Sequence, residues 1–292
     1  MHFRTSLAAF AILGVWGCAA MAADTPVNLS KPASPDGSVK IENVAGSIRV
    51  VGWDMKEIKV TGTAGEGVEA VDFTVSGSRA TIEVKLKKGF KGSRGKADLE
   101  ISIPKASAVV VETVSADIDV SGLERSVDLE SVSGSVTLSG RARDVKVETV
   151  SGNVTLKGAI EKVKAESVSG TLRLQEVAGE VDASTVSGAI EVLGREITGA
   201  SCESVSGSVV FAGPLTRGSR YSFDSFSGNV TLRLPADTDA DVSMSTFSGK
   251  AVNEIQGTRV SGKDASFVLG DGGAKVTIDT FSGNALIEPL TQ

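Results

Sequence analysis

The chain has 292 residues, of which 33 are glycine and only 4% are aromatic, and its formal net charge is −6. This modest acidic balance, with Lys and Arg mostly scattered, argues against nucleic acid as a partner, because phosphate backbones are bound by clustered basic side chains. So few aromatic rings also argue against a round core of ordinary composition, since rings supply much of the buried area in such cores. One basic stretch, Lys85 to Lys96, is predicted to be a solvated loop between two strands.

The first residues read as a secretory signal. A basic start, MHFR, precedes the apolar run LAAFAILGVWG, which is too short to span a bilayer. Small residues follow in AAMAAD, so residues 1–23 are predicted to be a signal peptide cleaved after Ala22 or Ala23, which implies export to the periplasm or cell surface. The alternative is an outer-membrane lipoprotein with a lipid anchor at Cys18, although Trp16 occupies a position where such signals normally have a small residue.

A linker is predicted over residues 24–38, and an N-terminal β section that caps the fold over residues 39–108. The stretches EIKVTG, ATIEVKL and ADLEISI alternate apolar and polar residues, which is the period of a strand. The TVSG at Thr74–Gly77 is not a copy of the repeat described next, because Arg79 and Thr81 would then fall in the core.

Residues 109–292 repeat one phrase, [Ser/Thr]-[Val/Phe]-Ser-[Gly/Ala], nine times at spacings of 18, 18, 18, 18, 19, 21, 21 and 34 residues. A weaker copy, ENVAGSIRV, opens the section before it at Glu42–Val50. A period near 20 indicates a solenoid, and the alternation in VKVET and NVTL indicates strands. We therefore predict an all-β fold, a single-stranded parallel β-helix (β-solenoid) with about 18–21 residues per coil and an N-terminal β cap.

Three columns of apolar residues are predicted to fill the interior. The columns are Leu129, Val147, Ala165, Ala183, Cys202, Phe223, Met244 and Ile278; Val136, Val154, Leu172, Ile190, Val209 and Val230; and Leu138, Leu156, Leu174, Val192, Phe211 and Leu232. Because Cys202 belongs to the first column, it is predicted to be a core residue and not a reactive thiol.

The Val or Phe of each phrase has two interpretations. Strict alternation from Leu129 points Val132 outward, which would create an exposed apolar stripe and a binding surface. A bulge or corner before it would turn Val132 inward, and we favour this second interpretation because an apolar residue recurs in every copy. The glycine that follows suits a tight bend, and Ala116 in the first copy suggests that the bend does not always need a positive φ.

Few residues suggest chemistry. The only histidine, His2, lies in the predicted signal, so the mature chain lacks the residue on which Ser-His-Asp triads and many metal sites depend. An outward column of carboxylates is predicted to be a solvated face, because no long loops surround it to build a glycosidase pocket. Its members are Glu112, Glu130, Glu148, Glu166, Glu203 and Asp224. No catalytic, cofactor-binding or metal-binding residue is predicted.

Three features near the C-terminus carry further predictions. Asp237, Asp239 and Asp241 stand in a turn that could bind calcium, although the sequence lacks the glycine and the closing glutamate of a calcium loop. The glycine-rich Gly270–Gly273 is predicted to be a hairpin turn. Pro289 is expected to block strand pairing at an open edge.

Four stretches carry a resemblance: ENVAGSIRV, ISIPKASAVVVETVSADIDV, VTLRLPADTDADVSMSTFSG and GDGGAKVTIDTFSGNALI. Together they resemble the bacterial "putative adhesin" family, formerly the domain of unknown function 4097. The resemblance implies an exported or envelope-associated parallel β-helix with no established enzymatic role. The function predicted is therefore a non-enzymatic adhesin or envelope interaction or structural protein, whose partner is a protein or glycan of the envelope. The alternative is a polysaccharide-active lyase or hydrolase built on a β-helix.

Overall fold

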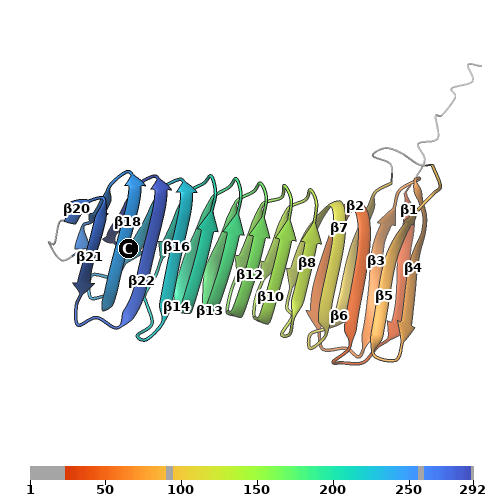
Figure 1. Cartoon of the computed structure of the whole chain (residues 1–292). Helices are drawn as coiled ribbons and strands as arrows, with labels where there is room; N and C mark the ends of the chain where they lie inside the picture. Colours follow the sequence, from red (N-terminus) through yellow and green to blue (C-terminus); the bar gives the residue numbers. More distant parts are fainter. Residues whose placement is uncertain (1–23, 90–94, 256–259, 291–292) are drawn as a thin grey trace, which may run out of the picture.

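The computed structural model describes residues 24–89, 95–255 and 260–290, which form a single 23-stranded sheet wound into a rod (Figure 1). The predicted signal, with His2 and Cys18, lies outside the described residues. No helix in the described part of the chain is long and apolar enough to cross a membrane.

The strands follow one another along the chain with short connections. The first six are β1 (Thr25–Pro32), β2 (Ser38–Trp53), β3 (Glu57–Ala64), β4 (Val68–Ser76), β5 (Arg79–Leu86) and β6 (Ala97–Pro104). The middle strands are β7 (Ala108–Ser121), β8 (Val127–Ser131), β9 (Val136–Ser139), β10 (Ala142–Thr149), β11 (Val154–Lys157), β12 (Ile160–Ser167), β13 (Leu172–Thr185), β14 (Ile190–Ser204), β15 (Val209–Ala212), β16 (Arg220–Ser227) and β17 (Val230–Leu234). The last are β18 (Ala240–Ser248), β19 (Ala251–Asn253), β20 (Val260–Gly262), β21 (Asp264–Leu269), β22 (Ala274–Ser282) and β23 (Ala285–Pro289).

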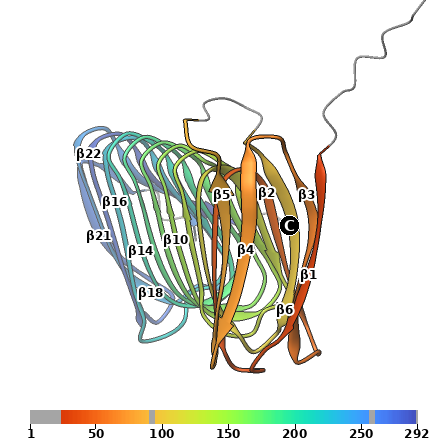
Figure 2. The ribbon, with the colours of Figure 1, turned by 90° about the vertical axis from the view of Figure 1, so that its right-hand side faces the viewer.

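The middle of the rod is a parallel β-solenoid with two walls, which confirms the predicted fold class. Equivalent residues of successive coils pair in parallel, so Val147 lies between Leu129 and Ala165. We call the wall that contains β8, β10, β12 and β16 the first wall, and the wall that contains β9, β11, β15 and β17 the second wall. The long strands β7, β13 and β14 contribute to both walls. Viewed from its N-terminal end, the rod shows its coils stacked one behind another around a narrow interior (Figure 2).

The predicted core columns are confirmed. Every member of the three columns is buried, and Cys202 is completely so. Because the two walls face each other across a thin space, mostly aliphatic side chains fill it. The largest fully buried side chains among the described residues are Phe211, Tyr221 and Phe223, and Phe211 contacts both other rings.

The N-terminal cap combines one true coil with antiparallel strands. β2 pairs in parallel with β7 along both walls, with Ile41 opposite Val111 and Ile48 opposite Ile118, so the weaker copy of the repeat is the first coil. On its other side β2 pairs with β5 and β6, and these are covered by antiparallel β4 and β3. The turn after Ser76 belongs to the β4–β5 hairpin, which confirms that Thr74–Gly77 is no repeat.

Two further predictions concern this cap. The predicted linker over residues 24–38 is wrong in part, because Thr25–Pro32 is strand β1, whose alternating Val27 and Leu29 pack against the core as it pairs with β3. The basic stretch joins β5 to β6, as predicted, and its described Lys87 and Lys88 are exposed.

At the C-terminal end, stacking order departs from sequence order. β22 pairs with both β16 and β18, and β23 pairs with both β17 and β19, so the last coil of the chain is inserted between two earlier ones. Antiparallel β21 and β20 then cover β18 and β19. Figure 1 shows β22 between β16 and β18.

The insertion corrects two predictions. Gly270–Gly273 does form a turn, but it joins β21 to β22 on opposite sides of β18, so it is not a hairpin. Pro289 does not block an open edge, because it lies opposite Leu234 inside the sheet and the Leu290 N–H donates to the Leu234 carbonyl at 2.8 Å. A proline is tolerated there because the pairing of β23 with β19 ends at Ile287, so the strand has a free side at Pro289, as at a sheet edge.

Candidate functional site

The Val and Phe residues of the repeated phrase are exposed, so the favoured inward corner is wrong and the exposed stripe is correct. In one copy Leu129 and Ser131 are buried, whereas Val132 is 47% exposed. The alternation of the strand simply continues through Ser131, which places the next side chain outside. We call the resulting row the apolar edge. In stacking order it contains Val44, Val114, Val132, Val150, Val168, Val186, Val205, Phe226, Phe281 and Phe247.

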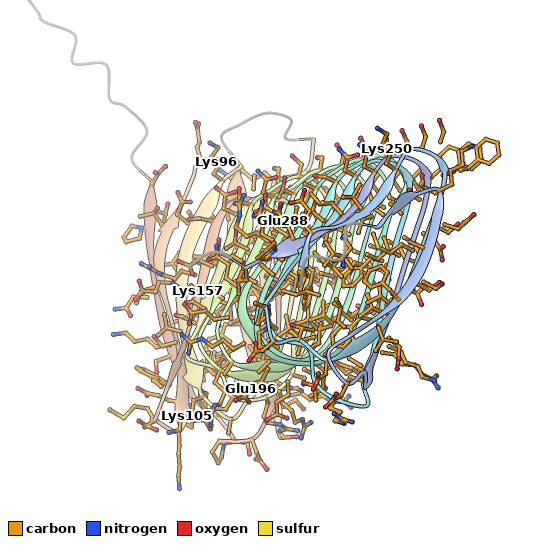
Figure 3. The ribbon with its side chains drawn as sticks, turned by 90° about the vertical axis from the view of Figure 1, so that its left-hand side faces the viewer. Lys96, Lys105, Lys157, Glu196, Lys250 and Glu288 are labelled. Atoms are coloured by element: carbon orange, nitrogen blue, oxygen red, sulfur yellow. The ribbon has the colours of Figure 1, made fainter. Side chains whose placement is uncertain are left out.

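Backbone hydrogen bonds between coils hold the apolar edge in place. The Ser133 N–H donates to the Val114 carbonyl at 2.8 Å, and the Ser151 N–H donates to the Val132 carbonyl at 3.0 Å. These turns lie in a row along the upper margin of the rod in Figure 1, where the first-wall strands end. Lys250 directly follows the Ser248–Gly249 bend. Seen from the C-terminal end of the rod, it lies at one margin, and Lys105 and Glu196 lie at the opposite margin (Figure 3).

Three phenylalanines form a stacked ladder at the C-terminal end of the apolar edge. The ring centroids of Phe226 and Phe281, and those of Phe281 and Phe247, are 4.8 Å apart, with interplanar angles of 2° and 7°. Phe281 is the middle ring because β22 is inserted between β16 and β18. The Lys263 Nζ lies 5.6 Å from the centroid of the Phe247 ring. The rings therefore cover one another's faces and present their edges outward.

The predicted carboxylate column runs beside the apolar edge on the first wall. Along the valine part of the edge, lysines neutralise most of it. The Lys40 Nζ is 2.7 Å from Glu42 and 2.9 Å from Glu112, the Lys146 Nζ is 2.6 Å from Glu148, and the Lys164 Nζ is 2.8 Å from Glu166. These lysines stand two residues before a glutamate, so both side chains project from the same outer face of a strand.

This neutralisation stops after Ser184. Ser201, Ser222 and Thr277 now occupy the positions two residues before the carboxylates Glu203, Asp224 and Asp279. No ion pair joins these three carboxylates to a Lys or Arg of the described residues, and Asp224 instead accepts a hydrogen bond from the Ser222 hydroxyl at 3.0 Å. Burial, followed by the charge of neighbouring Asp224, raises the pKa of the Asp279 carboxyl. The phenylalanine end therefore carries uncompensated negative charge.

A groove follows the apolar edge on the side of the carboxylates. Its valine part has a volume of about 500 Å³. Its C-terminal part, which we call the phenylalanine groove, has a volume of about 800 Å³. The two parts share Ser167, Ser184 and Val186 in their linings. The lining of the phenylalanine groove includes the three stacked rings, the carboxylates Glu203, Asp224, Asp264 and Asp279, and Lys263. Such a surface is suited to holding a ligand with both apolar and polar parts.

The other singled-out residues lie elsewhere. Asp239 accepts a hydrogen bond from the Asp271 N–H at 2.8 Å and lies 3.6 Å from Arg217. The described residues contain no group of three or more Asp, Glu, His or Cys placed to hold a metal ion, so Asp237, Asp239 and Asp241 are not brought together around one site. Burial raises the pKa of the Cys202 thiol to about 12, which agrees with its predicted place in the core.

Comparison with known proteins agrees with the architecture. No curated protein matches the chain. A "putative adhesin" from Parabacteroides merdae ATCC 43184 is 11% identical with a TM-score of 0.53, over 90% of this chain and 96% of that one. A "putative adhesin" from Bacteroides fragilis NCTC 9343 is 11% identical with a TM-score of 0.50, over 91% of this chain and 99% of that one. Likeness at this identity shows the fold alone. The profile of the family Toastrack DUF4097 matches residues 37–262, and the chain belongs to that family.

Proposed function

We propose that the chain is a non-enzymatic, exported interaction protein of the cell envelope, in which the solenoid is the scaffold and the apolar edge is the surface that holds a partner. The observation that carries the proposal is the exposure of an apolar residue at every step of the edge, from 36% at Val44 to 65% at Phe247. Apolar side chains gathered on one exposed surface mark an interaction site in a folded protein.

The energetics support binding at this edge. Because each side chain of the edge is already about half buried, covering it contributes on the order of 1 kcal/mol, so a partner that covers several of them gains a useful affinity. The coil-to-coil hydrogen bonds fix the edge before binding, which reduces the entropy that a partner must overcome. The two similar solved structures are each described as a "putative adhesin", and an adhesive role fits a rigid rod with one continuous apolar side.

The carboxylates also favour a binding role over glycan cleavage. Glu148 and Glu166 are each held by a lysine on their own strand. They stand on an open wall beside a long groove, and the groove has a shape that accepts a chain along the rod. Export is supported by the predicted signal in residues 1–23.

The test is retention of the mature chain, residues 24–292, on envelope fractions of the source bacterium by co-sedimentation. The key variant is Phe226→Ser/Phe247→Ser/Phe281→Ser, whose changes are exposed and leave the core intact. Its retention is expected to fall at least about tenfold, because three buried side chains are lost from the interface. Met55→Ser is the matched control, since Met55 is 60% exposed but lies away from the edge between β2 and β3. Equal retention of the triple variant, or no retention of the unaltered chain, overturns the proposal.

A further inference from the structure

We propose that the phenylalanine groove binds a cationic amphipathic peptide segment in an extended conformation. The inference rests on the proposed function and deepens it, because it assigns the partner's chemistry to one end of the apolar edge.

Charge complementarity is the first argument. The lining of the groove holds four carboxylates and one lysine, so it has a net charge of −3 when the carboxylates are ionised. Asp224 and Asp279 are register neighbours on β16 and β22, so their like charges lie side by side. A Lys or Arg of a ligand placed between them removes this repulsion and gains two attractive contacts.

The valine part of the edge supplies an internal comparison. It offers a similar apolar column and a similar wall of carboxylates, but Lys40, Lys146 and Lys164 neutralise Glu112, Glu148 and Glu166. Of the four carboxylates that line this part, Glu130 alone has no ion pair with a Lys or Arg of the described residues. A cationic ligand gains nothing by displacing those lysines. Neighbouring carboxylates without a lysine partner and the larger aromatic side chains occur together in the coils of Phe226 and Phe281, whereas Ser245 takes the carboxylate position in the coil of Phe247. The preference for a cation therefore belongs to this end.

The stacking of the rings argues for aliphatic side chains and against sugars. Aromatic platforms bind other flat or ring-shaped groups through free ring faces. In the ladder both faces of Phe281 are covered, by Phe226 on one side and by Phe247 on the other. The ladder therefore presents a ridge of ring edges, against which Leu, Ile or Val side chains can pack, and only the outer faces of the two end rings are not covered by another ring. The carboxylates oppose an anionic lipid surface.

The dimensions fit a short segment. The groove runs along five coils, those of Val186, Val205, Phe226, Phe281 and Phe247, and begins at Ser167 of the coil before them. At about 4.8 Å per coil they span about 19 Å, which an extended chain covers with about six residues.

The experiment measures fluorescence anisotropy of a labelled synthetic octapeptide of alternating leucine and lysine against the mature chain at low ionic strength. Octapeptides of alternating leucine and glutamate, and of alternating serine and lysine, are the probes that lack the positive charge or the apolar groups. We expect only the leucine–lysine peptide to bind, with an affinity that falls as salt is added. Asp224→Asn/Asp279→Asn is expected to weaken binding about fivefold or more, the effect of two exposed charge pairs. The matched control Glu148→Gln/Glu166→Gln is expected to stay within about twofold.

Several results would overturn the inference. These are equal binding of the leucine–glutamate peptide, equal binding of the serine–lysine peptide, no binding of any peptide, or capture by phosphatidylglycerol vesicles in place of the peptide. The two proposals fail separately. If envelope retention depends on the three phenylalanines but no peptide binds, the proposed function stands and this inference falls. If the peptide binds but the triple phenylalanine variant is retained on the envelope as well as the unaltered chain, the inference stands and the proposed function falls.

Discussion

Each residue of the repeated phrase has its own task at the bend. The buried hydroxyl comes first. In some copies it holds the bend from inside, since the Gly152 N–H donates to the Thr149 Oγ1 at 3.0 Å and the Thr280 hydroxyl donates to the Gly283 carbonyl at 3.0 Å, whereas the hydroxyls of Ser167, Thr185 and Ser204 are buried without a hydrogen-bond partner among the described residues. The Val or Phe that follows is exposed on the apolar edge, and the next serine continues the backbone ladder. The glycine closes the bend against the coil before it. The phrase recurs because every residue stacks on a copy of itself.

The glycine column is expected to tolerate no side chain, and Gly170 is the position to test. Its φ is not in the left-handed region, so its role is close approach: a Cβ there would press into the carbonyl oxygen of Gly152. Gly170→Ala and Gly170→Val should each lower the free energy of unfolding by about 3 kcal/mol or more. Urea denaturation measures this, with Glu166→Gln, a surface change expected to cost less than about 0.5 kcal/mol, as the control.

Ala116 occupies the position of Gly170 in the first copy of the phrase, which would make alanine acceptable there. Ala116 lies in β7, which like β2 runs through the bend as an unbroken strand, whereas β8 ends at Ser131 and β9 begins only at Val136. The two bends therefore differ in shape, and Ala116 does not report on the space at Gly170. A Gly170→Ala variant as stable as the unaltered chain would show that the coils are less tightly stacked.

The thiol of Cys202 is expected to be inert in the folded chain. Burial raises its pKa to about 12, so at pH 8 the nucleophilic thiolate is scarce and the sulfur is also inaccessible. The aromatic disulfide 5,5′-dithiobis(2-nitrobenzoate) should react with the mature chain at pH 8 only after urea is added, releasing one equivalent of chromophore. Fast reaction in the native protein would contradict the register that places Cys202 between Ala183 and Phe223.

At the scale of the strand, the alternation of side chains carried most of the information. It predicted the strands, the core columns and the place of Cys202, because a strand that buries one side of itself must alternate. At Val132 two signals conflicted, and the alternation was the correct one. A hydrophobic residue recurring outside is the mark of a binding surface, and its change from Val to Phe at 226, together with the loss of lysine two residues before the carboxylate, could have pointed to the groove.

The order of the last coils could not be predicted from the sequence, for a physical reason. Each coil offers the same parallel edges and the same core columns to its neighbour, so the repeats of Phe226, Phe247 and Phe281 can stack in more than one order. The observed order is set by β20 and β21. They pair antiparallel with β19 and β18 on the side that faces the end of the rod, so β22 and β23 pair on the other side, toward β16 and β17.

Engineered disulfides test the inserted coil. Thr277 lies in register with Ser222 of β16 and with Ser243 of β18, so β22 separates the two serines. The pairs Ser222→Cys/Thr277→Cys and Ser243→Cys/Thr277→Cys should each cross-link under mild oxidation, because neighbouring strands bring Cα atoms within the limit of about 7 Å. The pair Ser222→Cys/Ser243→Cys should not, since two strand spacings are about 9.6 Å. Cross-linking of that last pair alone would mean that the coils stack in sequence order.

At the scale of the whole molecule, the rod is a stack whose two ends are both closed by antiparallel strands. A parallel solenoid presents unpaired N–H and C=O groups at each end and would otherwise grow by stacking on another copy. Here β4 and β1 form the N-terminal edges, and β21 and β20 form the C-terminal ones. The two ends are thus protected, which leaves the side of the rod as the surface at which we propose that a partner binds.

Deleting β1 tests this protection. Pro26 and Pro32 of β1 lie opposite residues of β3, so β1 covers the edge of β3. The Lys31 Nζ donates to the Phe73 carbonyl of β4 at 2.6 Å, which connects β1 to the other edge strand at this end. Without residues 24–32 the outer edge of β3 is unpaired. The shortened chain, residues 33–292, should self-associate as its concentration rises, as sedimentation velocity would measure, while the mature chain stays unchanged in size. A synthetic peptide of residues 24–33 added in trans should suppress the association, because it restores the missing strand. The prediction is contradicted if the shortened chain does not associate, or if the added peptide leaves its association unchanged. Either result would mean that β1 is not what protects this end.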